Sequence, residues 1–286
     1  MAEFELDLED NIFELYLDLR NNRYQHSSYF NFKIADPKPR TIHKACVRDR
    51  VMHQAVFRSI NPVFEETFIF DSDASRVGKG VRKSVFRLDS FVQKTSKNFT
   101  RPVYAVKIDV CKFFASIDHQ ILFQLIKERI ACSKTLELIS NIIESFSMSS
   151  NKGIPLGNVT SQLFGNIYLD SLDKFIKYEL QEKYYLRFSD DMIIVKEEDN
   201  FDTLILAIEK FARTNLNLSL KTEVPRKLKW GFDWLGYVIL PHHRILRTRT
   251  KNRMFKRINF ENVSSYLGLL KHCNSYKLKE KLKLLE

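Results

Sequence analysis

The sequence has few of the residues that mark several protein classes. It contains 4 cysteines among 286 residues, and they form no C-x-x-C pair: Cys46, Cys111, Cys132 and Cys273. Scattered cysteines argue against a disulfide framework and against a zinc site, and they predict reduced, mostly packed thiols. Only 8 glycines occur and no Gly/Ser-rich tract is present, so no flexible linker separates one part of the chain from another.

Long apolar runs are also missing. No stretch approaches the ~20 residues that a helix needs to cross a bilayer. The segment MAEFELDLED is acidic where a signal peptide would be basic and then apolar. We therefore expect a cytoplasmic protein with no membrane partner.

Acidic residues are outnumbered by basic ones. The chain has 46 Lys plus Arg against 35 Asp plus Glu, a formal net charge of +11. This excess favours polyanionic partners without specifying which. A hydrophobic content of 44% is enough for a real core, built as one large domain or as two to three subdomains around one site.

Two apolar segments show the strand pattern that matters most. VYAVKIDV at 103–110 alternates and is β-branched, and YYLRFSDDMIIVK at 184–196 predicts two short strands joined at Ser189-Asp190. Helical spacing predicts helices at 48–60, near 119–130 and 135–147, after Asn158 and at 201–214, with strands near 216–220 and 232–239. This order is a split βαβ arrangement, in which Asp109 can meet Asp190.

Three carboxylates, Asp109, Asp190 and Asp191, interrupt or end these apolar strands. Unpaired buried carboxylates are costly, so a bound cation is one explanation for them. Oxygen ligands suit Mg²⁺, and two such ions about 4 Å apart can hold the attacking and leaving oxygens of a phosphoryl transfer. Asp-Asp pairs are also common on solvated turns, and that alternative stays open for the pair taken alone.

The same segments resemble the motifs of reverse transcriptases. RFSDDMIIV is similar to their catalytic hairpin, with Phe188 in place of the usual Tyr, and VKIDVCKFFASIDH resembles their first catalytic motif. Seven motifs follow in the family's order between about residues 35 and 275 of the sequence. The resemblance implies an α+β right-hand polymerase fold with fingers, a palm built on the split βαβ sheet and a short helical thumb. It divides the chain into fingers with an N-terminal helix at 1–102, a palm at 103–240 with part of the fingers inserted near 119–158, and a short basic thumb at 241–286.

The resemblance also implies residue roles. Two Mg²⁺ ions would be held by Asp109, Val110, Asp190 and Asp191. Phe114 would exclude a ribose 2′-hydroxyl, and Lys221 in LSLKTE would donate a proton. The incoming deoxynucleoside triphosphate would be bound by Lys38, Arg40, Leu156, Gly157 and Gln162. Primer and template would be contacted by the hairpin FDWLGYVI and by basic segments, at Trp234, Leu235, Gly236, Tyr237, Arg76, Lys79, Arg247, Arg249, Lys251 and Arg253.

One motif narrows the resemblance. Most reverse transcriptases carry Pro-Gln-Gly and then Ser-Pro where this chain has Pro155-Leu156-Gly157 and Ser161-Gln162. This pattern resembles the enzymes of diversity-generating retroelements, which copy a template RNA with frequent errors at adenines and work with a small basic accessory protein. Leu156 also removes a hydrogen-bonding group near the nucleotide, which favours lower fidelity. The alternative that Leu156 merely packs stays open.

The expected function is therefore Mg²⁺-dependent synthesis of cDNA on an RNA template, with the RNA/DNA duplex as product. Two alternatives remain: another prokaryotic reverse transcriptase, from phage defence or close to group II introns, and a non-catalytic RNA-binding scaffold. The segment RILRTRTKNRMFKR at 244–257 has seven basic residues and no acidic one. Such a run is either a solvated face or, as we expect here, a track for phosphates.

Overall fold

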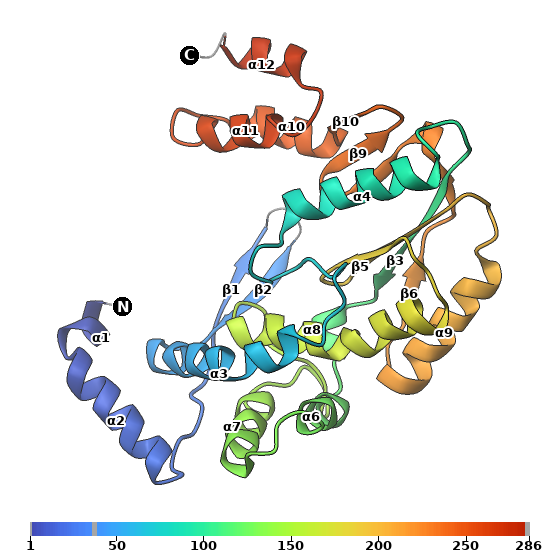
Figure 1. The fold of residues 1–286 in the computed structure, drawn as a ribbon. Helices are drawn as coiled ribbons and strands as arrows, with labels where there is room; N and C mark the ends of the chain where they lie inside the picture. Colours follow the sequence, from blue (N-terminus) through green and yellow to red (C-terminus); the bar gives the residue numbers. More distant parts are fainter. Residues whose placement is uncertain (1, 36–38, 284–286) are drawn as a thin grey trace. The chain divides into compact units, whose positions relative to one another are not determined.

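Apolar segments that are mostly buried build a central antiparallel sheet around three strands. In the computed structural model, which describes residues 2–35 and 39–283, β3 (Tyr104–Val110) pairs with β5 (Asp191–Lys196), and β5 pairs with β4 (Tyr185–Phe188) (Figure 1). The strands follow the order β4-β5-β3-β6, and β7 (Arg226–Lys227) also pairs with β3. The predicted sequence of strand, helices, hairpin, helix and strand is confirmed.

The chain divides into two compact units, each assembled from several segments. The first unit comprises Met1–Phe70, Val110–Phe175 and Ala207–Leu220, and the second comprises Asp71–Asp109, Ile176–Leu206 and Lys221–Glu286. The boundaries expected for fingers, palm and thumb stay predictions.

Helix α8 (Val159–Lys174) is the centre of the first unit. It begins after Asn158, as predicted, and α3 (Val47–Glu65) and α6 (His119–Lys127) pack against it. Asp118 caps α6, because its carboxylate accepts hydrogen bonds from the first free amides of the helix. The other elements of this unit are α1 (Ala2–Leu6), α2 (Leu8–Arg20), β1 (Phe30–Ile34), β2 (Arg40–Lys44), α5 (Phe113–Ser116), α7 (Ser133–Glu144) and most of α9 (Asp202–Leu216).

The strand predicted near 216–220 is wrong in position. Helix α9 continues to Leu216, and β6 occupies Leu220–Thr222. Leu216 and Leu218 are both buried, and the Tyr168 hydroxyl donates a hydrogen bond to the Leu216 carbonyl. The apolar alternation came from the buried end of a helix and the segment after it.

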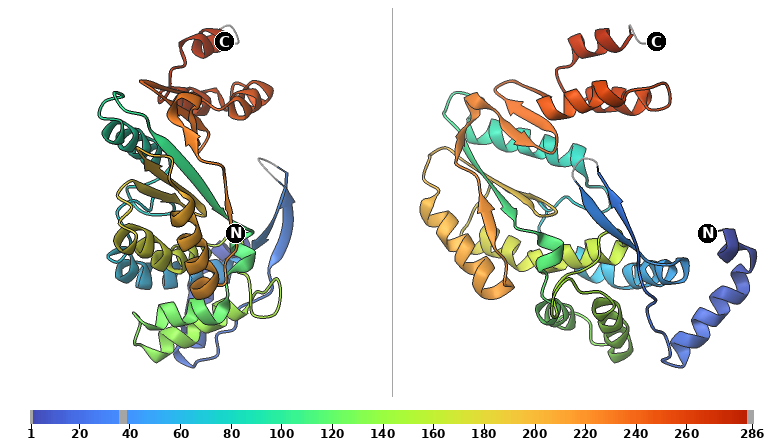
Figure 2. Two further views of the ribbon diagram at one scale, coloured as in Figure 1. Left: turned by 90° about the vertical axis from the view of Figure 1, so that its right-hand side faces the viewer. Right: turned by 180° about the vertical axis from the view of Figure 1, so that it is seen from behind.

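In the second unit α4 (Val81–Thr95) packs against β4 and β5 (Figure 1). The strand predicted over 232–239 is a hairpin of β8 (Phe232–Trp234) and β9 (Tyr237–Leu240), extended by β10 (His243–Leu246). The basic run 244–257 covers most of β10 and all of α10 (Thr248–Arg257), and Figure 2 shows the helices that follow it. They are α11 (Val263–Leu270) and α12 (Tyr276–Lys283). The second unit also contains most of the π-helix η1 (Phe175–Glu179) and the 3-10 helix η2 (Leu228–Trp230).

Two expectations from composition meet the structure here. All four cysteines are free, but Cys46, Cys111 and Cys132 are exposed, so the expectation of mostly packed thiols is wrong. Across residues 2–35 and 39–283, none of the helices combines the length and apolar character that a membrane span requires.

Candidate active site

Two of the three predicted carboxylates are neighbours on adjacent strands of the central sheet. Asp109 near the end of β3 is the direct cross-strand partner of Asp191, the first residue of β5. Directly opposed residues of an antiparallel pair project from the same face. Asp190 precedes Asp191 in the two-residue turn after β4, which we call the carboxylate turn, Ser189-Asp190. Asp109 therefore lies at the end of the sheet where the turn with Asp190 begins, and a meeting of Asp109 with Asp190 stays a prediction.

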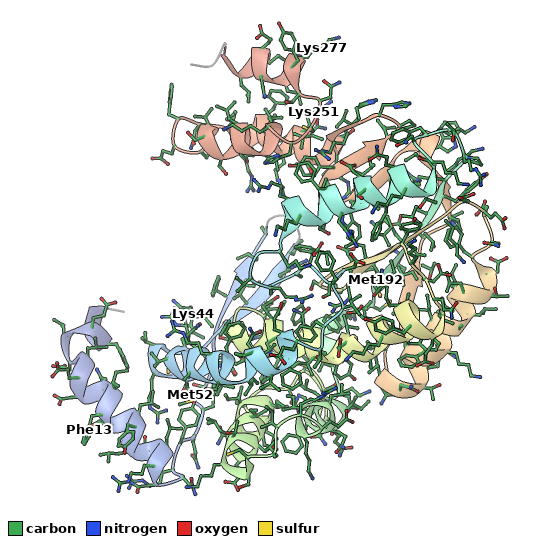
Figure 3. All side chains as sticks on the ribbon, viewed as in Figure 1. Phe13, Lys44, Met52, Met192, Lys251 and Lys277 are labelled. Atoms are coloured by element: carbon green, nitrogen blue, oxygen red, sulfur yellow. The ribbon has the colours of Figure 1, made fainter. Side chains whose placement is uncertain are left out.

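These carboxylates are less buried than the sequence suggested. Asp109 is exposed, and Asp190 and Asp191 are half-buried, whereas the next residue, Met192, is fully buried. Figure 3 labels Met192. The apolar run belongs to the inner part of β5, and the acids lie where the sheet meets water. Desolvation is therefore a weaker argument for a bound cation than the sequence implied.

The chemistry of the donors nevertheless fits a hard divalent cation. Two opposed carboxylates with a third beside them offer oxygen ligands, and Mg²⁺ commonly binds one or two carboxylates while keeping several waters. Among the residues that the structure describes, no group of three His, Cys, Asp or Glu side chains is arranged to hold an ion by itself. Val110, the last residue of β3, is buried.

The predicted nucleotide-binding segments of the first unit are joined through strand β2. The His43 amide donates to the Leu156 carbonyl at 2.9 Å, and the Asn158 side-chain amide donates to the His43 carbonyl at 3.2 Å. Gly157 has φ +118°, and a Cβ there would lie 2.9 Å from Ile42 Cγ2. Only glycine fits this close approach, so the Leu-Gly segment is fixed against β2.

Arg40 is the exposed first residue of β2, and Gln162 is a half-buried residue in the first turn of α8. Lys38 lies outside the described residues.

Phe114 lies on α5 beside α8. Its ring contacts Phe113 edge-on, with centroids 5.2 Å apart. A Cβ on Gly165 would lie 3.1 Å from the Phe113 ring and 3.8 Å from the Phe114 ring, so the glycine lets both rings approach the helix. Phe113 is buried and Phe114 only half-buried, which leaves Phe114 as the ring with an accessible edge.

The hairpin predicted to grip the primer holds its aromatic side chains inward. Trp234 is 1% exposed and donates its indole N–H to the Ser84 hydroxyl at 3.0 Å, and Tyr237 is 3% exposed and donates to the Leu269 carbonyl. Both side chains are part of the core, so the primer contact predicted for these residues would have to come from their backbone. Leu235 and Gly236 form the turn between the strands and remain the predicted contact.

The basic residues predicted to contact template have intramolecular partners. Arg76 donates to the Ser72 carbonyl at 2.7 Å, and Lys79 lies 3.5 Å from Asp73. Arg247 pairs with Asp233 at 2.7 Å. Lys221 is exposed on β6, and the remaining basic residues, Arg249, Lys251 and Arg253, lie on α10, where Figure 3 labels Lys251.

Comparison with known proteins decides the family. A family model described as reverse transcriptase (RNA-dependent DNA polymerase) matches residues 33–239. The chain belongs to the reverse transcriptase family. The match covers β3, the carboxylate turn and the Leu-Gly segment.

Two curated proteins are similar to this family member at low identity. Protein YkfC of Escherichia coli is 21% identical over 252 residues, which cover 72% of this chain and 62% of that protein. A putative COX1/OXI3 intron 2 protein of Saccharomyces cerevisiae is 21% identical over 255 residues, which cover 66% of this chain and 29% of that protein. The chain thus spans less than two thirds of the length of either relative.

Solved structures with the same fold include two telomerases. Apo telomerase from Candida tropicalis, truncated from its C-terminal domain, aligns with a TM-score of 0.58 at 12% identity and covers 83% of this chain and 60% of its own. Telomerase from Candida albicans with a fragment of telomeric RNA aligns with a TM-score of 0.57 at 10% identity, over 80% and 46% of the two chains. At such identities the likeness concerns the fold alone, and it confirms the α+β right-hand polymerase fold.

Sequence reasoning missed a group of buried polar residues next to the carboxylate turn. Arg187, Asp71 and Asp73 are each 3% exposed or less. Burial raises the pKa of Asp73 above its ordinary value, against the opposing effect of Lys79. The signal for it in the sequence is a charged residue, Arg187, inside the apolar strand YYLRF.

Proposed function

We propose that this chain is an RNA-directed DNA polymerase that copies a template RNA into cDNA from deoxynucleoside triphosphates. The observation that supports this most is the pairing of Asp109 with Asp191 at the end of the central sheet, with Asp190 beside them in the turn. The chain's formal net charge of +11 agrees with nucleic-acid partners.

Asp109, Asp190 and Asp191, with Val110, would hold two Mg²⁺ ions. Bound there, the ions supply neutralisation of the charge on the transferring phosphoryl group. The chain's own groups do the rest: Arg40 and Lys38 bind the triphosphate, Phe114 limits the space at the sugar, and Lys221 donates a proton to the leaving pyrophosphate.

The aspartate in the turn provides the direct test. Asp190→Asn keeps the size of the side chain but removes its charge, so we expect primer extension on an RNA template to fall at least ~100-fold, as for other groups that stabilise transition-state charge. RNA affinity should stay unchanged. Asp199→Asn, in the exposed segment after β5, is the matched control and should extend normally. Extension by Asp190→Asn at the wild-type rate would exclude the proposed site.

We further propose that the chain is the reverse transcriptase of a diversity-generating retroelement, with a small basic accessory protein as partner. Pro155-Leu156-Gly157 followed by Ser161-Gln162 supports this assignment. The backbone of Leu156 is bonded to β2, and its aliphatic side chain offers no hydrogen bond with which to reject a misaligned base.

The error spectrum tests this narrower proposal. We expect cDNA made on a defined RNA to carry errors concentrated at template adenines, measured by deep sequencing. Leu156→Gln, which restores an amide, should lower that error frequency, and Leu206→Gln on the exposed face of α9 should not. Errors spread evenly over the four bases would indicate another kind of reverse transcriptase.

A further inference from the structure

Arg187 in β4 is a fully buried charged side chain two residues before the carboxylate turn. It is 0% exposed, and its Nη1 donates a hydrogen bond to the Ser189 carbonyl at 3.0 Å. Ser189 has φ +57°, in the left-handed region that non-glycine residues seldom adopt. A charge-assisted bond therefore holds the peptide group that leads directly into Asp190.

A short segment at the edge of the sheet, residues 71–73, pairs with the backbone of this arginine. Ser72 pairs with Arg187 in parallel, the Asp73 amide donates to the Arg187 carbonyl at 3.0 Å, and the Arg187 amide donates to the Asp71 carbonyl at 2.9 Å. The segment extends the sheet at β4, and two of its residues, Asp71 and Asp73, are buried.

Asp71 is itself held from two other elements. Arg87 of α4 lies 2.6 Å from one carboxylate oxygen, and Lys177 of η1 lies 2.7 Å from the other. Lys177 also donates to the Tyr185 carbonyl on β4. The segment 71–73, α4 and η1 thus fix the strand that carries Arg187, and the arginine cannot shift without breaking several buried polar contacts.

A buried guanidinium is a poor way to gain stability, since an apolar side chain of similar size usually packs as well. Here the charge reaches a carbonyl in a strained turn next to the catalytic acids. We propose that Arg187 is a positioning residue, which fixes the carboxylate turn so that Asp190 and Asp191 present their oxygens to the metal ions. This inference rests on the proposed polymerase function for its kinetic readout, but not for its metal-binding readout.

Arg187→Lys is the primary variant. Lysine keeps the buried charge but loses the planar fork that reaches the Ser189 carbonyl. We expect kcat for primer extension to fall about 10- to 100-fold and the Mg²⁺ concentration for half-maximal rate to rise, as when partners of ligating groups are removed. The KM for deoxynucleotides and the affinity for RNA should change little. Arg101→Lys is the matched control, because Arg101 is exposed and forms its ion pair with Glu197 at 2.9 Å.

Binding of Mn²⁺ to the full chain, followed by electron paramagnetic resonance without nucleic acid or nucleotide, gives an independent readout. Wild type and Arg101→Lys should bind alike, and Asp191→Asn and Arg187→Lys should bind more weakly. Wild-type primer extension with unchanged kcat and Mn²⁺ affinity in Arg187→Lys would overturn the positioning role and leave the polymerase standing. Weakened Mn²⁺ binding in Arg187→Lys, in a chain that extends no primer, would support the positioning role and reject the polymerase.

Ser189→Gly reaches the same turn without disturbing a buried charge. Glycine adopts the left-handed conformation freely and loosens the turn, so we expect weaker Mn²⁺ binding with the fold retained, checked by circular dichroism. If Arg187→Lys does not fold, Arg187→Gln, which removes the buried charge, decides by the same measurement: unchanged Mn²⁺ affinity in a folded Arg187→Gln would overturn the proposal.

Discussion

Phe114 differs from its neighbour Phe113 in what it leaves accessible. Both rings lie against Gly165 of α8, but Phe113 is 3% exposed and Phe114 is half-buried. A half-buried ring that packs against a helix has little freedom to move. This is what exclusion of a single hydroxyl group requires, because a mobile side chain would move aside.

We predict that Phe114→Val admits ribonucleotides. Discrimination against ribonucleoside triphosphates, measured as the ratio of kcat/KM values, should fall about 10- to 100-fold, since a lost steric contact of this size is worth 1–3 kcal/mol. Use of deoxynucleotides should be nearly preserved.

Phe260→Ala removes an aromatic ring that is 82% exposed and serves as the control. Unchanged sugar discrimination in Phe114→Val would remove the residue from this role.

At the scale of elements, helices α3 and α8 are joined by a buried polar contact. His53 of α3 is 1% exposed, and its ring makes a 2.7 Å hydrogen bond with the Thr160 hydroxyl of α8 and a 3.0 Å contact with His26. Burial, with the nearby His26 as a smaller cause, lowers the pKa of His53 to about 4. The two helices are therefore packed around a histidine that is neutral at neutral pH.

This contact predicts a loss of stability in mild acid. Below pH ~6.5 an unfolded His53 takes up a proton that the folded chain excludes until about pH 4, so its contribution is complete above pH ~6.5 and declines as the pH falls. We expect the free energy of unfolding by urea to drop about 2 kcal/mol from this group between pH 7 and pH 5.

His53→Gln keeps a hydrogen-bonding group without a titration, so most of that drop should disappear. His243→Gln, at an exposed histidine of β10, should keep it. The carboxylate of Asp49 has a lowered pKa, so its own loss falls at more acidic pH. An unchanged pH dependence in His53→Gln would assign the effect to other groups.

At the scale of the whole molecule, the positive charge is unevenly distributed. The segment 244–257 carries seven of the 46 Lys and Arg residues and no acid. Two of the seven, Arg244 and Arg247, are paired with Asp89 and Asp233. The other five lie together on α10, so we expect this helix to make the main contribution to RNA binding.

We predict that replacing Arg249, Lys251 and Arg253 by Gln weakens RNA binding at every sequence. The slope of log K against log salt concentration should become shallower by about 2, at ~0.7 per phosphate contact for single strands. Filter binding over a salt series measures it.

The control is the same charge change at three exposed residues. Lys127 ends α6, Arg129 follows α6, and Lys134 lies on α7. Equal slopes for the two triple variants would show that net charge alone matters.

Local patterns in the sequence determined most of the elements and the chemical types of the candidate site. The alternation at 103–110 and the apolar run at 191–196 predicted strands, and helical spacing predicted α3, α6, α8 and α9. The split βαβ order predicted that Asp109 can meet the hairpin with Asp190 and Asp191 at one end of the sheet. These features follow from backbone periodicity and nearest neighbours, which the order of residues fixes directly.

Only the tertiary structure decided which side chains face outward and which support them. Trp234 and Tyr237 turn into the core, the opposed partner of Asp109 is Asp191, and Arg187 lies beneath the turn because residues 71–73 join β4 from more than a hundred positions away. Burial and register depend on contacts between distant segments, and a side chain's own sequence neighbours carry no record of them.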